Sequence, residues 1–300
     1  AESRVRFDSH RLVDAVLGAL TGRPGGFASH LVYTTRVGRG RAVYTIDSDG
    51  ADSRSYGYAL ETAWSPTFGP RPAGSTAPPP APGEPEQEIW FTQSQNYGPF
   101  RLVHGPEATP LQLNVPGSIL GVSFSPDGSK LALAVMNEGQ GKIWVGLANG
   151  TNLAPLSTAP LASQPVHGPL GKLAWVAGEK IRRVYVDGKP VSPAGFSASA
   201  PTFCDSKQGL LVVFTIGFGA GADIFATDTN GGHLTRLTQH QGHNTFAACS
   251  PDGRMVSFFS NRKGGNGPGI YQLPIGQPWR AKRVSGDTGE WLRWSASSKT

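Results

Sequence analysis

The tetrapeptide Ser-Pro-Asp-Gly occurs twice in this chain, at Ser125–Gly128 and Ser250–Gly253, each time between two short apolar runs. Proline presets φ, aspartate hydrogen-bonds to nearby backbone, and glycine adopts positive φ, so the string predicts the turn of a β-hairpin. Recurrence of such a hairpin within one chain indicates a radial or stacked β-repeat. This repeat limits the architectures that the chain can adopt.

The residue before each turn helps to extend the repeat. Phe124 and Cys249 hold this position in the two clear copies, and we assign four further equivalents: Trp64, Trp175, Cys204 and Trp294. The last two intervals are about 45 residues, which matches a four-stranded propeller blade. The interval from Trp175 to Cys204 is shorter, so we expect that blade to be thin or irregular.

The apolar runs around the turns predict the strands of two complete blades. They are Ile119–Phe124, Lys130–Met136, Lys142–Ala148 and Leu153–Ser157, and then Asn244–Cys249, Arg254–Ser260, Gly269–Ile275 and Trp279–Val284.

Four strands remain outside these units, one at the end of the chain and three near its start. They are Trp291–Ser295, Leu31–Arg36, Ala42–Asp47 and Asp52–Tyr58. A closed propeller loses its sheet edges when its two ends share one blade. We therefore predict an all-β, six-bladed propeller in which Trp291–Ser295 pairs beside Leu31–Arg36.

Composition agrees with an all-β protein. The chain has 40 Gly and 25 Pro among 300 residues and only 16% charged residues, as expected for many tight turns. Residues 67–87 are rich in Pro, Gly, Ala and Ser and predict a flexible loop inserted in the propeller. No apolar run is long enough to span a membrane.

The net charge of +6 is spread along the chain. The densest basic groups are Arg36, Arg39 and Arg41, and Arg280, Lys282 and Arg283. We interpret them as solvated strand faces and expect no nucleic-acid partner.

One helix is predicted before the propeller. Asp8 or Ser9 can cap its start, Gly22 and Pro24 end it, and Leu12, Val13, Val16, Leu17 and Leu20 follow a helical period. A helix this short needs a packing partner, which is either the propeller flank or another domain. The predicted division is a helix and linker over 1–27 and the propeller over 28–300.

The same region resembles a known family. His10–Ala15, Leu20–Phe27 and Leu31–Tyr33 resemble the junction between the two domains of the TolB family, and the Ser-Pro-Asp-Gly hairpins and Asp47–Gly50 resemble its blades. The resemblance runs from about Phe7 to the C-terminus. In that family an α/β domain precedes the helix, so 1–27 would be the remnant of such a domain.

The resemblance implies a non-catalytic, periplasmic, monomeric scaffold of the Tol–Pal system, without cofactor or metal, with its secretion signal removed. Its role would be in outer-membrane integrity and protein import in the cell envelope. Its partners would be the peptidoglycan-associated lipoprotein Pal, docked at one mouth of the propeller channel, and other Tol proteins. The family pattern Asn-x-x-Pro-x-aromatic falls on Asn244–Cys249, with Ala247 replacing Pro.

The resemblance predicts seven partner-binding residues. They are His243, Asn244 and Thr245, and by position Ser118, His167, Ser199 and Glu290. The alternative is that Asn244 and Thr245 only satisfy neighbouring backbone groups.

Two other pairs of residues need a chemical interpretation. Cys204 and Cys249 occupy apparently equivalent places in adjacent blades, so we expect packing thiols in aromatic positions. A disulfide is the alternative and needs Cα atoms within about 7 Å. His240 and His243 lie in a loop, and we do not expect them to bind a metal.

The alternative function is a small-molecule-binding or hydrolytic propeller. The chain has no Gly-x-Ser-x-Gly nucleophile motif. A metal-dependent propeller needs several carboxylates around the channel, and only Glu61, Asp205 and Glu290 lie close to predicted inner strands.

Overall fold

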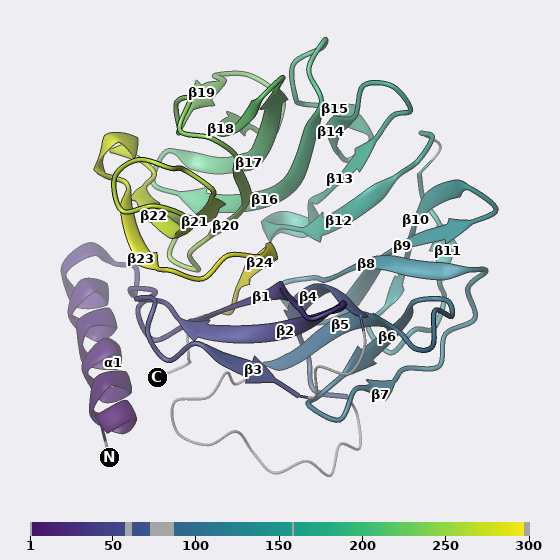
Figure 1. The fold of residues 1–300 in the computed structure, drawn as a ribbon, viewed down its shortest axis with the longest axis horizontal. Helices are drawn as coiled ribbons and strands as arrows, with labels where there is room; N and C mark the ends of the chain where they lie inside the picture. Colours follow the sequence, from purple (N-terminus) through teal and green to yellow (C-terminus); the bar gives the residue numbers. More distant parts are fainter. Residues whose placement is uncertain (1, 58–61, 73–86, 158, 297–300) are drawn as a thin grey trace.

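The computed structural model describes residues 2–57, 62–72, 87–157 and 159–296. Within these residues, one helix, α1 (Glu2–Thr21), precedes 24 β-strands that form antiparallel sheets around a ring (Figure 1). The predicted all-β class with an N-terminal helix is therefore confirmed. None of the described helices is long and apolar enough to cross a membrane.

The largest sheet contains the first seven strands and the last one, in the order β24-β1-β2-β4-β5-β6-β7 with β3 paired to β2. Between β2 and β4 its continuity rests on one parallel pair, Arg41 with Thr62. Its strands are β1 (His30–Val37), β2 (Gly40–Asp47), β3 (Arg54–Tyr56), β4 (Thr62–Gly69), β5 (Glu88–Ser94), β6 (Arg101–His104), β7 (Thr109–Pro110) and β24 (Glu290–Trp294).

The other strands form four sheets of four consecutive strands each. They are β8 (Ser118–Phe124), β9 (Lys130–Asn137), β10 (Gln140–Leu147) and β11 (Ala154–Pro155); β12 (Ser163–His167), β13 (Leu173–Ala177), β14 (Arg183–Val186) and β15 (Lys189–Pro190); β16 (Ala198–Ser206), β17 (Gly209–Phe218), β18 (Gly221–Asp228) and β19 (Thr235–Arg236); and β20 (Asn244–Cys249), β21 (Met255–Ser260), β22 (Gly269–Pro274) and β23 (Lys282–Ser285).

Six strands lie toward the centre of the ring (Figure 1). In the order β4, β8, β12, β16, β20 and β24, each contacts the next, and β24 contacts β4 again. We call these the inner strands.

The two ends of the β-structure meet as predicted. Strand β24 pairs antiparallel with β1, with Leu31 opposite Trp294 and Val32 opposite Arg293. Leu31 and Leu292 are fully buried. The backbone N–H of His30 donates to Ser295 Oγ at 2.9 Å, which fastens the last described residues to the start of β1.

Both Ser-Pro-Asp-Gly strings form the predicted turns. In the first, the Gly128 N–H donates to the Ser125 carbonyl at 2.8 Å, and Gly128 has φ of +72°. Hydrogen bonds from Ser125 and Ser129 lower the pKa of Asp127 to about 2. The second turn repeats this arrangement, with Gly253 at φ of +70°.

The repeat is displaced from the predicted alignment at Trp175, at Trp64 and, as described below, at Cys204. Trp175 lies on β13, the second strand of its sheet, and the inner-strand position belongs to His167. Trp64 lies before a β-bulge in β4, and Phe68 follows the bulge at the position we assigned to Trp64. The sheet β12–β15 is thin, as expected, but it has four strands of five, five, four and two residues.

The prediction that Cys204 and Cys249 are separate packing thiols is wrong, because they form a disulfide with Cα atoms 5.3 Å apart. The two positions are not equivalent. Cys249 is the second residue after the bulge of β20, whereas Cys204 is the third after the bulge of β16.

The neighbouring units show why this offset permits a bond. The third residue after the bulge is Gly69 in β4, and it is Gly168, directly after the end of the strand, in β12. A Cβ added at Gly69 would meet the ring of Phe124, and one at Gly168 the ring of Phe203, both at 2.4 Å. The third position therefore faces the pre-turn position of the next sheet, and in this pair both hold cysteine.

Helix α1 starts at Glu2, six residues before the predicted cap Asp8. Ser9 Oγ donates to the Val5 carbonyl at 2.7 Å, so it lies inside the helix instead of capping it. The helix ends at Thr21 before Gly22, as predicted.

Polar contacts hold α1 to the β-structure. Asp14 is 6% exposed, and its carboxylate accepts the backbone N–H groups of Phe27 and Ala28. Arg6 pairs with Asp49 at 3.2 Å. Most of the predicted apolar stripe does not pack on the ring: Leu12, Val13, Val16 and Leu20 are exposed.

The Pro-rich insertion begins later than predicted. Thr67, Phe68 and Gly69 belong to strand β4 and are buried, so they are not part of a loop. Residues 73–86 of the predicted loop lie outside the described residues, as does Glu61.

The buried contact of β24 leads to a stability prediction. Replacing Leu292 by Ala should lower the free energy of unfolding by about 2–5 kcal/mol, because it leaves a cavity where β1 and β24 meet. Deleting residues 290–300 should abolish cooperative melting. Urea and thermal unfolding measure both effects, with the exposed Leu234→Ala as the control. Unchanged melting after the deletion would refute the closure.

The disulfide leads to a second prediction. Its sequence separation is 45 residues, and the chain-entropy model assigns a loop of that length about 4 kcal/mol. The Cys204→Ala, Cys249→Ala double variant should therefore lose about 2–4 kcal/mol of unfolding free energy. Adding a reductant should destabilise the natural protein similarly and leave the double variant unaffected. Equal stability of both proteins would argue that the bond does not form in solution.

Candidate functional site

The inner strands begin at one end of the ring, and their first residues surround its mouth. Near these starts, Ala200 N–H of β16 donates to Gln164 Oε1 of β12 at 2.7 Å, and Val122 N–H of β8 donates to Ser65 Oγ of β4 at 3.4 Å. The starts of adjacent inner strands thus lie side by side. Six of the predicted partner residues lie at these strand starts: Ser118, Asn244 and Glu290 are the first residues of inner strands, Ser199 and Thr245 are the second, and His243 directly precedes β20.

His167 does not join them. It is the last residue of β12, and its backbone N–H donates to Ser123 Oγ near the end of β8 at 2.9 Å. The match by position predicted His167 at the mouth, but the structure places it at the other end of β12. Its ring Nδ1 lies 3.2 Å from the Ser123 carbonyl, which identifies Nδ1 as the donor. Burial lowers the pKa of His167.

Asn244 connects two charged groups of the mouth. It is fully buried, its Nδ2 donates to Asp223 Oδ1 at 3.0 Å, and its Oδ1 accepts from Arg262 at 3.3 Å. A buried amide with both ends bonded positions its neighbours and offers no free group to a partner. The exposed group here is His243, whose backbone N–H donates to Asn261 Oδ1 at 2.6 Å.

Asp223, on β18, is the buried acid of this network. It is 1% exposed and forms an ion pair with Arg236. Burial opposes ionisation of its carboxyl group, but hydrogen bonds from Arg236, Thr238, the His240 backbone and Asn244 outweigh this effect and lower its pKa. The carboxylate is therefore ionised and already saturated with donors.

Aromatic side chains around the mouth were missed by the sequence analysis. Trp291 lies 6.0 Å from the ring of Trp64 and 5.6 Å from that of Phe246. Arg41 lies 4.9 Å above the Trp64 ring and pairs with Glu290 at 2.5 Å. Trp291 and Phe246 have positive φ at β-bulges, and such non-glycine outliers cluster at functional sites.

A signal for these bulges is present in the sequence. Ser65, Gln164 and Ala200 have positive φ, and each is followed directly by proline. The family pattern carries a proline at the same place, where this chain has Ala247 after Phe246. A proline therefore follows the bulge residue on β4, β12 and β16, and the bulges of β20 and β24 lack this signal.

A cavity of about 840 Å³ opens beside His243 between the β19–β20 and β21–β22 loops. We call it the basic cavity, because Arg262, Lys263, Arg283, His240 and His243 line it and no Asp or Glu does. Its remaining lining residues are Ala220, Gln241, Gly242, Asn261, Gly264, Gly265, Asn266, Tyr271 and Ala281.

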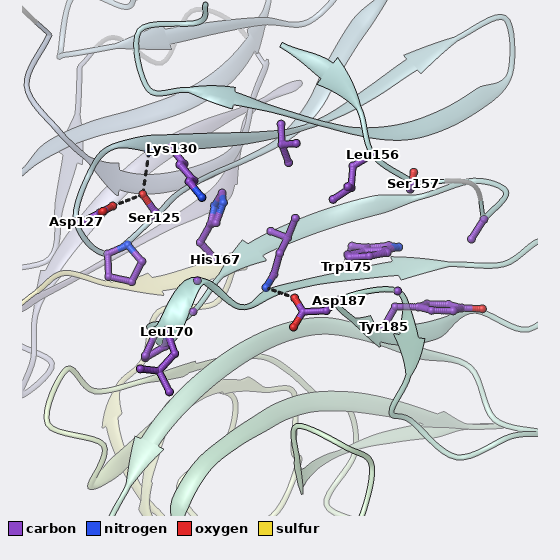
Figure 2. Close-up of a pocket in the computed structure, with 18 residues that line it drawn as sticks. Ser125, Asp127, Lys130, Leu156, Ser157, His167, Leu170, Trp175, Tyr185 and Asp187 are labelled. Atoms are coloured by element: carbon purple, nitrogen blue, oxygen red, sulfur yellow. Dashed lines mark hydrogen bonds between the residues drawn. The ribbon is translucent and has the colours of Figure 1, made fainter. Parts of the chain in front are cut away.

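A second cavity of about 740 Å³ lies at the opposite ends of β8 and β12. Figure 2 shows His167 beside Lys130 in one part of it, and Trp175 with Tyr185 in another. The rings of Trp175 and Tyr185 are stacked, with centroids 6.1 Å apart. This cavity is mixed in character, with Asp127 and Asp187 among its lining residues.

The lowered pKa of Asp223 predicts a pH dependence of stability. The ionised carboxylate is favoured in the folded state, so its contribution is complete above the ordinary value of 3.8 and is lost as pH falls through the lower folded value. Asp223→Asn should therefore destabilise the protein at pH 7, by about 1–3 kcal/mol. The difference in unfolding free energy between the natural chain and Asp223→Asn should become smaller as the pH falls from about 5 to about 2.

Urea unfolding at a series of pH values tests this prediction. Asp8→Asn, which breaks an exposed pair with Arg4 on α1, is the matched control and should show little difference at any pH. If the difference in unfolding free energy between Asp223→Asn and the natural chain does not change with pH, the charge of Asp223 does not stabilise the fold as proposed.

No family model matches the chain. A 65-residue segment is 37% identical to the Tol-Pal system protein TolB of Thiobacillus denitrificans and covers 22% of this chain and 15% of that protein. A 69-residue segment is 33% identical to TolB of Polaromonas naphthalenivorans and covers 23% of this chain and 16% of that protein. The matches thus span less than a fifth of these curated relatives.

Solved structures share the fold at low sequence identity. TolB from Acinetobacter baumannii has a TM-score of 0.70 at 18% identity over 98% of this chain and 73% of that one. A putative TolB from Agrobacterium tumefaciens has a TM-score of 0.62 at 13% identity over 89% and 97%. Puromycin hydrolase shares the fold at a TM-score of 0.58 and 14% identity over 86% and 52%. The chain is thus similar to TolB in fold and, over about a fifth of its length, in sequence.

Proposed function

We propose that this chain is a non-catalytic periplasmic scaffold that docks a Pal-like peptidoglycan-associated lipoprotein at the mouth of its propeller. In this role it supports outer-membrane integrity within the Tol–Pal system. The observation that carries the proposal is the TolB-like fold with a preformed rim around His243. The match to proteins named as Tol-Pal system components supports the choice of partner.

The strand topology supports six blades. The eight-stranded sheet is joined by one residue pair between β2 and β4, so we divide it into β24-β1-β2-β3 and β4-β5-β6-β7. With the four four-stranded sheets, this division makes six units, each with one inner strand. The terminal strands then share one blade, and a closed ring leaves no edge that forces assembly, so we propose a monomer.

The mouth has the properties of a docking platform for a folded protein. Its loops are fixed by buried hydrogen bonds, as at Asn244, and by the pairing of Arg41 with Glu290. Aromatic and Arg side chains, here Trp64, Phe246 and Arg41, are enriched at protein interfaces. A rigid rim loses little conformational entropy on binding, which favours affinity.

Helix α1 supports the view that residues 1–27 are the remnant of an α/β domain. Its exposed apolar residues Leu12, Val13, Val16 and Leu20 lie away from the ring contacts. In the natural protein we propose that a further domain covers this face. The contacts of Asp14 and Arg6 would then fix the position of that domain on the propeller.

A hydrolytic or small-molecule-binding propeller is the second candidate. The likeness to puromycin hydrolase and the mixed cavity near Trp175 favour it. Turnover of peptide, lactone or phosphoester substrates by the purified chain, without any captured protein, would support this candidate over the scaffold.

Capture of a Pal-like lipoprotein from a solubilised outer-membrane extract tests the scaffold. The natural chain should retain it, and His243→Ala should weaken retention by about tenfold, as expected for an interface hot spot. Asn244→Ala should weaken it too and also lower the melting temperature, because Asp223 and Arg262 lose their shared partner.

The matched control is Lys207→Ala, in the exposed turn at the opposite end of β16. It should retain the partner as the natural chain does. Retention that is equal for His243→Ala and the natural chain would exclude the mouth as the docking surface. Mass spectrometry of the retained proteins identifies the partner.

A further inference from the structure

The basic cavity concentrates positive charge without an internal counter-ion. Arg262, Lys263 and Arg283 line it together with His240 and His243, and none of its lining residues is acidic. From the sequence, Arg283 is expected on a solvated strand face. The structure instead directs it to the same hollow as Arg262, which follows the end of another strand, β21.

Arg262 is held in place by neutral groups. Its guanidinium carbon lies 3.7 Å from the centroid of the Tyr271 ring, and its Nε donates to Ser260 Oγ at 2.8 Å. Its Nη2 donates to Asn244 Oδ1 at 3.3 Å. Among the described residues it forms no ion pair, and burial lowers its pKa, so an external anion would relieve the cost of keeping it charged.

Arg283 is fixed in a similar way. Its Nε donates to the Ser285 carbonyl at 3.2 Å and its Nη1 to the Asn266 carbonyl at 2.5 Å. Two guanidinium groups are thus oriented without a carboxylate partner in the described part of the chain. Arginine held in this way is suited to bidentate binding of a carboxylate.

The buried acid that is bonded to Asn244 does not neutralise the cavity. Asp223 has a side chain that is 2% exposed and forms an ion pair with Arg236, and neither residue lines the cavity. It also accepts hydrogen bonds from Thr238 at 2.7 Å and from Asn244 at 3.0 Å. Asn244 turns its carbonyl oxygen to Arg262, so the carboxylate of Asp223 and the guanidinium of Arg262 remain separated by one amide.

We propose that the basic cavity receives an acidic segment of the docked protein, with a Glu or Asp carboxylate seated against Arg262. Arg283 and Lys263 supply further positive charge to the same segment. The inference rests on the proposed docking function and specifies the chemistry that the partner must present beside His243. A nucleic acid is disfavoured because it needs a continuous basic stripe, whereas these cations are confined to one hollow.

The test is a calorimetric titration, at low salt, of the purified chain with an end-capped penta-glutamate peptide. Penta-glutamine is the neutral control peptide. The acidic peptide should bind, and Arg262→Gln should weaken binding by about tenfold or more, as expected for loss of a charge-assisted hydrogen bond. Lys263→Gln should weaken it by about threefold, as expected for an exposed charge.

The control variant is Lys207→Gln, which removes the same charge at the other end of β16 and should leave binding unchanged. Lys263 is exposed, so its variant stays informative if Arg262→Gln proves unstable in a melting experiment. Inorganic phosphate is titrated in parallel.

Three results would overturn the proposal. The first is that penta-glutamate does not bind the natural chain. The second is that it binds the Arg262→Gln and Lys263→Gln variants as tightly as the natural chain. The third is that phosphate binds, penta-glutamate does not, and the two variants weaken the binding of phosphate. Competition separates the proposal from the docking function. If the lipoprotein is captured but penta-glutamate does not displace it, only the acidic-segment proposal fails. If the peptide binds and no lipoprotein is captured, only the docking function fails.

Discussion

The pairing of β24 with β1 holds the ring together, because it joins residues that are furthest apart in the chain. The contact is apolar and specific: Leu31 and Leu292 are fully buried, and the last described residues bond to His30. Strand β24 also contacts the inner strands β20 and β4 on its two sides. The rim around His243 therefore depends on a strand that supplies Glu290 and Trp291 to the mouth.

Bulges on the inner strands give the mouth its shape. Each bulge turns a residue such as Trp291 or Phe246 into a positive φ conformation and toward the channel end of its strand. The same bulges set which residue reaches the next sheet. At β16 and β20 this register brings two thiols together, and elsewhere it brings a glycine against an aromatic ring.

The ring, its closure and its turns could be predicted from the sequence, since the Ser-Pro-Asp-Gly strings and the leftover strands are local patterns. The register within each inner strand could not, because a bulge shifts it by one residue without changing the hydrophobic pattern. That shift explains the wrong assignment of Cys204 to the aromatic positions. His167 was misplaced for another reason: Trp175 was assigned to an inner strand but lies on β13, the second strand of its sheet. The network of Asp223, Asn244 and Arg262 was also hidden, since it joins residues of β18, β20 and the loop after β21.

The disulfide makes one seam of the ring different from all others that the structure describes. Strands β16 and β20 are tied covalently, whereas the seam between β1 and β24 is held only by hydrogen bonds and packing. A force that pulls the ring apart can therefore open a seam that only hydrogen bonds and packing hold, such as the one where the chain's ends meet. The two sheets beside the basic cavity would stay joined through Cys204 and Cys249 while the ring opens elsewhere.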